Sequence, residues 1–253
     1  MNSPRPVAQT LFSLRVFFLV VYFAITIVLV STCLILSWPF PHRLRFFVAR
    51  TWSRGMLWAG RIFCGIDWIV EGRENLPPGP SVLYIKHSSV FEPYAQIGLF
   101  PQQTWVVKRE LLFTPVLGWG MATMRCIAID RGAGSKAVKQ VIRQGKRRLA
   151  EGIWVTIFPE GTRMEPGETR RYGISGAALA REAGCLIVPV AHNASDVFPR
   201  KGLPKRPGRI RFCVGPPIDP SAQDPKETNK IAQAWIESKM AEISEGYKAS
   251  GDA

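Results

Sequence analysis

Cysteine is scarce in this sequence, and the few that are present form no recognisable pattern. They are widely spaced and include no CxxC pair: Cys33, Cys64, Cys126, Cys185 and Cys213. An odd number of scattered cysteines does not make the disulfide framework of a small secreted domain, and it lacks the paired spacing of a structural zinc site. We therefore expect free thiols in a reducing, cytosol-facing compartment.

Acidic residues are also few relative to basic ones. Asp and Glu number 19 against 33 Lys and Arg, which gives a net charge of +14. This excess favours a partner rich in phosphate, and nucleic acid, anionic lipid and phosphorylated small molecules all remain open on charge alone. With 22 Gly, 20 Pro and 47% hydrophobic residues in 253, the composition excludes collagen-like, coiled-coil and largely disordered chains.

Charged side chains are missing altogether between Val16 and Trp38. As a helix this run would be about 35 Å long, enough to cross a hydrocarbon core of about 30 Å, so it predicts a membrane helix. The alternative is a cleaved secretory signal, whose apolar region covers only about 7–15 residues and ends in a small-residue cleavage site. Here the run ends in Trp38-Pro39-Phe40-Pro41, which disfavours cleavage.

Residues 43–64 form a second N-terminal segment, with a helical pattern and two faces. Four of its arginines fall within about 40° of one another at 100° per residue, and apolar side chains occupy the opposite side. This predicts an interfacial helix with arginines on lipid phosphates, although a surface helix covering a globular core would show the same pattern. The two faces are Arg43, Arg50, Arg54 and Arg61 against Val48, Ala49, Trp52, Met56, Ala59 and Phe63.

These features divide the chain into residues 1–64, which we expect to be membrane-anchoring helices, and residues 65–253. More arginines follow the apolar run than precede it, which places the remainder on the cytoplasmic side. After Gly65, β-rich runs alternate with helical stretches, and this predicts a single α/β domain with a parallel or mixed sheet flanked by helices. Expected strands are 68–71, 81–86, 104–107, 126–129, 154–158, 185–190 and 210–214. Expected helices are 135–151 with Ser135 as N-cap, 175–183 ending at Gly184, and 227–247.

The segment YIKHSSVFEP contains a candidate base. His87 directly follows an expected strand, and Glu92 comes five residues later. A histidine with a nearby carboxylate can take a proton from a hydroxyl, because the carboxylate fixes the tautomer and stabilises the imidazolium. The alternative is a capping box from Ser89 to Glu92, which would put Pro93 at a position where its missing N–H costs a helix bond.

Three more segments lie where expected strands end. In IAIDRGAGS, Arg131 enters a glycine-containing loop before a helix, which suits a phosphate but also a plain connection. TIFPEGTR supplies a backbone turn, a hydroxyl and a guanidinium for an anion from Glu160, Gly161, Thr162 and Arg163. In LIVPVAHN, Pro189 interrupts an apolar run, which by itself indicates a buried strand.

Taken together, His87-x4-Glu92, IAIDR, FPEGTR and VPVA resemble the four motifs of the glycerolipid acyltransferases, specifically the PlsC type of 1-acylglycerol-3-phosphate acyltransferase. The resemblance covers residues 67–217, and KRELLFTPVLGWG from Lys108 to Gly120 also matches. Two positions depart from it. Glu92 stands where the wider family usually has Asp, and Gly173 stands where bacterial members often have Lys, which leaves the acceptor open.

The resemblance implies an enzyme that moves an acyl group from acyl-CoA or acyl-carrier protein to the sn-2 hydroxyl of lysophosphatidic acid, giving phosphatidic acid for phospholipid biosynthesis. It implies His87 as the base with Glu92 as its partner. It further implies a fold like that of glycerol-3-phosphate acyltransferase and a place in the membrane, on the cytoplasmic face of the bacterial inner membrane. The implied acceptor contacts are Lys108, Arg131, Glu160, Gly161, Thr162 and Arg163, with Pro189 on the donor side.

No metal and no cofactor are expected, because direct acyl transfer needs a base, an anion clamp and an apolar groove. The alternatives are acylation of another lysolipid, such as a lysophospholipid or an amino-acid lipid, and a non-catalytic lipid-binding protein with the same fold. Nucleic-acid binding is disfavoured, because the sequence contains a membrane segment and no recognisable nucleic-acid motif.

Overall fold

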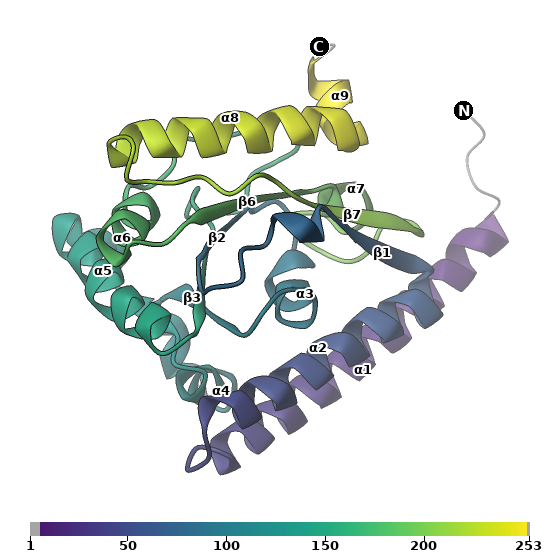
Figure 1. Ribbon diagram of the computed structural model, residues 1–253. Coiled ribbons are helices and arrows are strands. Elements are labelled where there is room, and N and C mark those ends of the chain that lie inside the picture. The colour runs from purple at the N-terminus through teal and green to yellow at the C-terminus, as the bar shows by residue number, and fades with distance from the viewer. Residues whose placement is uncertain (1–5, 252–253) are drawn as a thin grey trace.

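The computed structural model describes residues 6–251, with side chains for all of these except 6–8, 131 and 249–251. Helices and strands alternate along this part of the chain (Figure 1). The α-helices are α1 (Pro6–Leu36), α2 (His42–Cys64), α3 (Glu92–Leu99), α4 (Leu117–Thr123), α5 (Ser135–Ala150), α6 (Ser175–Ala183), α7 (Ala194–Val197), α8 (Pro225–Ile243) and α9 (Glu245–Gly251). Short 3-10 helices cover η1 (Arg73–Asn75), η2 (Arg109–Phe113) and η3 (Arg131–Ala133).

The strands form one seven-stranded mixed sheet in the order β1-β7-β6-β2-β5-β3-β4. Only β6 and β7 pair antiparallel among the described strands, and every other neighbouring pair is parallel. The predicted single mixed sheet flanked by helices is thereby confirmed. The strands are β1 (Ile66–Glu71), β2 (Val82–Ile85), β3 (Gln103–Lys108), β4 (Ile127–Ile129), β5 (Trp154–Ile157), β6 (Ile187–His192) and β7 (Gly208–Val214).

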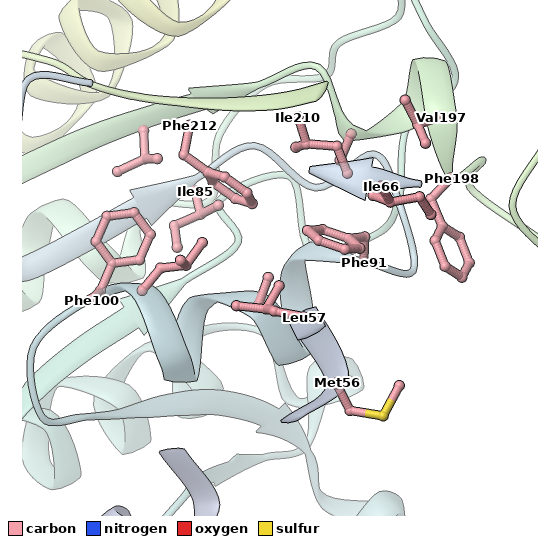
Figure 2. Packing of buried hydrophobic residues seen from close by; sticks show 14 of the residues in the cluster. Met56, Leu57, Ile66, Ile85, Phe91, Phe100, Val197, Phe198, Ile210 and Phe212 are labelled. Carbon is pink, nitrogen blue, oxygen red and sulfur yellow. The ribbon is translucent and has the colours of Figure 1, made fainter. Parts of the chain in front are cut away.

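Each face of the sheet has its own core, because successive side chains of a strand point to opposite faces. In the central strand β2, Val82 and Tyr84 join a cluster beneath α5, α6 and α8, whereas Leu83 and Ile85 join a cluster beneath α2 and α3. Figure 2 shows the second cluster, where Phe91 packs among the aromatic and aliphatic side chains of the sheet. All four β2 side chains are buried, so the strand that leads to His87 is fixed on both sides.

Helices α1 and α2 form a hairpin along one side of the molecule (Figure 1), joined by a short turn that contains Pro39 and Pro41. Within α1, residues Gln9–Leu36 have a mean hydropathy of 2.7, so this helix is long and apolar enough to cross a membrane. The predicted division at residue 64 stays a prediction, and both parts contribute to shared core clusters. Val16 and Leu19 of α1 pack in the same cluster as β2 and β7 residues.

Two parts of the predicted orientation of α2 are wrong: its apolar side does not face lipid, and Arg50 does not lie with the other arginines of its predicted face on the exposed side. The side that carries Ala49, Met56 and Ala59 is buried against the body rather than turned toward lipid, as in the alternative of a helix covering the core. Arg43, Arg54 and Arg61 are exposed, but the Arg50 guanidinium donates to the carbonyl oxygens of Ile97 and Phe100 at the end of α3. Arg50 therefore ties α2 to the body.

Two predicted helix boundaries need correction. Ser135 is the first residue of α5, not its cap, since Gly134 occupies that position without a side-chain bond. The C-terminal helix begins earlier, at Pro225, because Asp224 accepts hydrogen bonds from the amides of Lys226 and Glu227. It is also broken at Ser244, after which α9 begins. The predicted helix 175–183 is confirmed with its C-terminal Gly184, which has φ 63°.

Candidate active site

The site lies at the carboxyl ends of the central strands, where ligands usually bind in open α/β sheets. Strand β2 is parallel to both β5 and β6, so the segments that follow β2 and β5 emerge side by side at one edge. His87 follows β2, and residues 159–164 follow β5. The sheet therefore brings together two segments that are more than seventy residues apart in the sequence.

His87 and Glu92 form a direct pair. The His87 Nδ1 atom lies 2.6 Å from Glu92 Oε1, and the Glu92 side chain is fully buried. The imidazole stacks on the Phe158 ring with 4.2 Å between ring centroids. Since an ionised carboxylate only accepts hydrogen bonds, Nδ1 carries the proton and Nε2 is the nitrogen that can take one from a substrate.

The alternative interpretation of this segment as a capping box is wrong. Helix α3 begins at Glu92, and Pro93 lies in its first turn, where the missing N–H costs nothing. The Ser89 hydroxyl accepts from the Phe91 amide and donates to the Phe198 carbonyl oxygen, so it fastens the segment to the end of α7. Ser89 thus holds the loop between His87 and Glu92.

The loop after β5 is attached to His87 at two points. The His87 amide donates to Glu160 Oε2 at 3.0 Å, and the Met164 amide donates to the His87 carbonyl oxygen at 2.7 Å. Between these points Gly161 has φ 70°, a left-handed conformation that glycine adopts without strain. The loop is therefore held in a fixed position relative to the imidazole, with Thr162 and Arg163 presented beside it.

A polar pocket of about 240 Å³ opens in front of the imidazole, lined by His87, Gly161, Thr162, Arg163, Arg200 and Lys201. Its lining contains three cations and no carboxylate. Within the described chain, the buried Nε of Arg163 has no hydrogen-bond partner, so this guanidinium retains a donor for a ligand. The pocket suits a phosphate, which arginine recognises with several charge-assisted hydrogen bonds.

Arg200 and Lys201 were missed by the sequence analysis. Both lie in the irregular segment between α7 and β7, and Arg200 is positioned by an ion pair with Glu165 at 2.9 Å. A basic pair in a loop carries little signal by itself, because most such pairs are solvated surface residues. The signal available was its place shortly after the VPVA strand, since segments that follow parallel strands share one edge of the sheet.

An apolar groove of about 360 Å³ adjoins the polar pocket. Its walls come from α1, α2, α3 and the η2–α4 segment, and they include Ile27, Trp52, Tyr94 and Met121. Arg163 lines both the groove and the polar pocket. Helix α4 lies close to α1 because Gly120 faces Ser31, where a Cβ atom would come within 3.1 Å.

The remaining predicted acceptor contacts are Lys108, Arg131 and Glu160. Lys108 is exposed and 3.9 Å from Glu110, and it lines neither the pocket nor the groove. Arg131 begins η3, and its side chain is outside the described part of the structure. Glu160 is buried, and its oxygens face the Lys86 ammonium and the His87 amide.

Pro189 lies in the middle of β6. It is buried opposite Tyr84, and its carbonyl oxygen accepts from the Gly215 amide. It lines neither the polar pocket nor the apolar groove, as a structural strand proline would, and its place on the donor side stays a prediction. Of the predicted site residues with described side chains, the structure brings His87, Glu92, Gly161, Thr162 and Arg163 together.

Comparison with known proteins agrees with this geometry. The family model described as Acyltransferase matches residues 67–193. The chain is 42% identical to a 1-acyl-sn-glycerol-3-phosphate acyltransferase of Pseudomonas aeruginosa over 81% of each protein. It is 25% identical to a chloroplast 1-acyl-sn-glycerol-3-phosphate acyltransferase of Arabidopsis thaliana, covering 88% of this chain and 64% of that protein. The chain therefore belongs to the acyltransferase family.

A solved structure shares the whole fold. The crystal structure of the 1-acyl-sn-glycerophosphate acyltransferase PlsC from Thermotoga maritima superposes with a TM-score of 0.75 at 18% identity. The match covers 95% of this chain and 98% of that one, so it includes the N-terminal hairpin as well as the sheet.

Proposed function

We propose that this acyltransferase moves a fatty acyl group from an acyl thioester to the sn-2 hydroxyl of lysophosphatidic acid, giving phosphatidic acid. The observation that carries the proposal is that a cationic pocket, lined by His87, adjoins an apolar groove at Arg163. A lysophosphatidic acid has a phosphate that suits the cationic pocket and an acyl chain that suits the apolar groove, with its free hydroxyl between the two.

The chemistry follows from the His87–Glu92 pair. His87 Nε2 takes the hydroxyl proton as the oxygen attacks the thioester carbonyl carbon, and the Glu92 carboxylate stabilises the imidazolium that forms. The carbon–sulfur bond then breaks, and the imidazolium returns the proton to the thiolate. The proposed step uses only the two substrates and these side chains, without a metal or a cofactor. Either acyl-CoA or acyl-carrier protein supplies the same thioester.

Lysophosphatidic acid is favoured over zwitterionic lysolipids by the charge of the pocket. Arg163, Arg200 and Lys201 offer three cations to the phosphate, and the lining contains no carboxylate to accept a headgroup ammonium. A phosphate monoester also carries up to two negative charges, so it gains more from these cations than a diester does.

The membrane would deliver this acceptor. We propose that α1 anchors the protein and that the exposed side of α2 lies on the cytoplasmic face of the bacterial inner membrane. This side combines apolar residues such as Phe47, Trp58 and Ile62 with Arg43 and Arg54, the composition of an interfacial helix. The apolar groove between the hairpin and the body would open toward the same surface.

The test is an acylation assay of purified full-length protein with lysophosphatidic acid and either donor. Wild-type protein should form phosphatidic acid, and His87→Ala should lower kcat by about 10²–10⁴, the range that general-base catalysis supplies. Glu92→Gln should be impaired less, since the hydrogen bond survives while the charge is lost. A folded His87→Ala variant with near-normal turnover would show that another group takes the proton.

A further inference from the structure

A buried ammonium lies directly behind the site. The Lys86 side chain is fully buried, and its ammonium donates two hydrogen bonds and forms an ion pair with a third group. The hydrogen bonds go to Glu237 Oε1 at 2.7 Å and to the Glu168 carbonyl oxygen at 3.0 Å, and the ion pair is with Glu160 Oε1 at 2.8 Å. Burying a lysine is costly unless it is paired, so these partners indicate a specific arrangement.

This ammonium connects the C-terminal helices to the catalytic loop. Glu237 belongs to α8, and its second oxygen accepts a hydrogen bond from the Tyr247 hydroxyl of α9 at 3.0 Å. On the other side of Lys86, Glu160 Oε2 accepts a hydrogen bond from the His87 amide. An unbroken chain of polar contacts thus runs from α9 to His87, through four side chains.

The cluster is a poor candidate for a second catalytic centre. Lys86 is fully buried and Glu160 nearly so, and none of its members lines the polar pocket. It instead contacts the loop that carries Thr162 and Arg163, because Glu160 is one of the two points at which that loop is attached to His87. Glu237 also lies outside residues 67–193, the part matched by the family model.

We propose that Lys86 and Glu237 are positioning residues for the acyltransfer reaction: the C-terminal helix sets the position of the Glu160–Arg163 loop, and hence of the acceptor phosphate, through the Lys86 ammonium. The inference rests on the proposed function for its kinetic consequence only. Its structural content, the attachment of the loop by a residue of α8, holds whatever acceptor the pocket binds.

Loss of Lys86 should be the more severe change. Burial raises the pKa of the Glu160 carboxyl, and the Lys86 ammonium acts against that effect. In Lys86→Met, Glu160 would lose the charge that favours its ionised form, and its bond to the His87 amide would weaken. Because this variant can fail to fold, Glu237→Ala is the second one, since Glu237 lies at the partly exposed edge of the cluster.

The kinetic experiment compares Glu237→Ala with Glu237→Gln and Glu242→Ala. Gln keeps an acceptor for Lys86, and Glu242 is on the same helix but pairs with Lys239, away from the cluster. Glu237→Ala should lower kcat/KM for lysophosphatidic acid by about tenfold to a hundredfold through a raised acceptor KM, as expected when a substrate is misplaced. The donor KM should be unchanged, Glu237→Gln should stay within about threefold and Glu242→Ala should equal wild type.

A purely structural role would give a different result, with a lower kcat from a smaller folded fraction and both KM values unchanged. That pattern, or wild-type kinetics in Glu237→Ala, would overturn the inference. Amide hydrogen exchange gives a readout independent of the substrate: residues 160–164 should exchange faster in Glu237→Ala than in Glu242→Ala. If wild-type protein acylates no lysophosphatidic acid, the proposed function fails, and unchanged exchange of this loop would separately refute the positioning role.

Discussion

Arg163 is the residue at which the polar and apolar parts of the site meet. It lines both the cationic pocket and the apolar groove, and its Nε is a buried donor without a partner in the described chain. An unpaired buried donor costs stability, so its retention fits a ligand that supplies the missing acceptor. In the proposed function, this position would put the guanidinium between the phosphate and the acyl chain of the acceptor.

This placement predicts how loss of two of the three pocket cations changes acceptor binding. Arg163→Ala should raise the acceptor KM by about 10- to 100-fold, since hydrogen bonds to charged groups contribute about 1.5–3 kcal/mol. Lys201→Gln should raise it only about two- to fivefold, because an exposed ion pair contributes up to about 1 kcal/mol. Steady-state kinetics with varied lysophosphatidic acid measures both.

The matched control is Lys139→Gln, which removes the same charge from α5, a helix that contributes no residue to the pocket. It should leave the acceptor KM at the wild-type value. If Arg163→Ala raises the donor KM and leaves the acceptor KM unchanged, the pocket holds the thioester carrier instead of the acceptor phosphate.

The predictable residues are those whose partners lie nearby in the sequence. His87 and Glu92 are five positions apart and adjoin one strand end, so their contact could be predicted from the segment alone. The contacts of Glu160 could not be predicted in this way, because Lys86 precedes it by more than seventy residues, and Glu237, the other carboxylate at Lys86, follows it by about as many. The sequence places Glu160 three positions before Arg163 but carries no local sign of the buried ammonium that it faces.

At the scale of the element, the orientation of helix α2 could not be predicted from its amphipathic pattern. The pattern places Arg43, Arg54 and Arg61 away from the apolar side of the helix, but it does not say whether that apolar side contacts lipid or protein. Here Met56 and Leu57 pack into the core, and the side facing outward carries both arginines and large apolar residues. The apolar side contacts protein because α3 and the sheet lie next to it, and the positions of these elements cannot be predicted from the sequence of α2 alone.

The exposed arginines of α2 should contribute to binding of anionic membranes. Replacing Arg43, Arg54 and Arg61 by Gln should lower partitioning onto anionic vesicles by about 100-fold at low salt, since each juxtamembrane cation contributes about 1 kcal/mol. Added salt should shrink the difference, because it screens exposed charges. Co-sedimentation with vesicles measures the effect. Replacing Lys139, Arg143 and Lys146 of α5 is the control, and an equal loss in that variant would refute a specific role of α2.

The start of α2 is fastened by a buried neutral histidine. His42 Nε2 donates to the Met124 carbonyl oxygen at 3.3 Å, and Nδ1 accepts from the Gln102 amide at 2.8 Å. Burial and neighbouring arginines lower the pKa of His42 from 6.5 to about 4, against the bond to Met124. Below pH 6.5 the unfolded chain therefore takes up a proton that the folded chain does not, and stability falls.

Removing the His42 imidazole should weaken the dependence of the unfolding free energy on pH at acid pH. Between pH 6.5 and about 4, His42→Gln should show a slope of unfolding free energy that is shallower by about 1.4 kcal/mol per pH unit. Denaturant unfolding of detergent-solubilised protein at several pH values measures it. Gln102→Ala breaks the same contact but keeps the ring, so it should retain most of the wild-type slope. Identical slopes in His42→Gln and wild type would show that His42 is not the group responsible.

At the scale of the whole molecule, the site is assembled between the N-terminal hairpin and the sheet. The apolar groove needs α1 and α2 on one side and α3 with the η2–α4 segment on the other, whereas the polar pocket needs only loops at the sheet edge. The sheet and its motifs could be predicted because strand periodicity is local. The groove could not, because its walls come from segments whose only connection is tertiary packing.

The most direct test of this account is a competition between two acceptors that differ only in the phosphate. Equal amounts of lysophosphatidic acid and the corresponding monoacylglycerol would be presented in one vesicle preparation, with limiting acyl donor, and the products measured by mass spectrometry. Since the pocket cations act on the phosphate alone, phosphatidic acid should exceed diacylglycerol by at least about 100-fold, and Arg163→Ala should reduce that ratio. Equal amounts of both products from the wild-type protein would contradict the account.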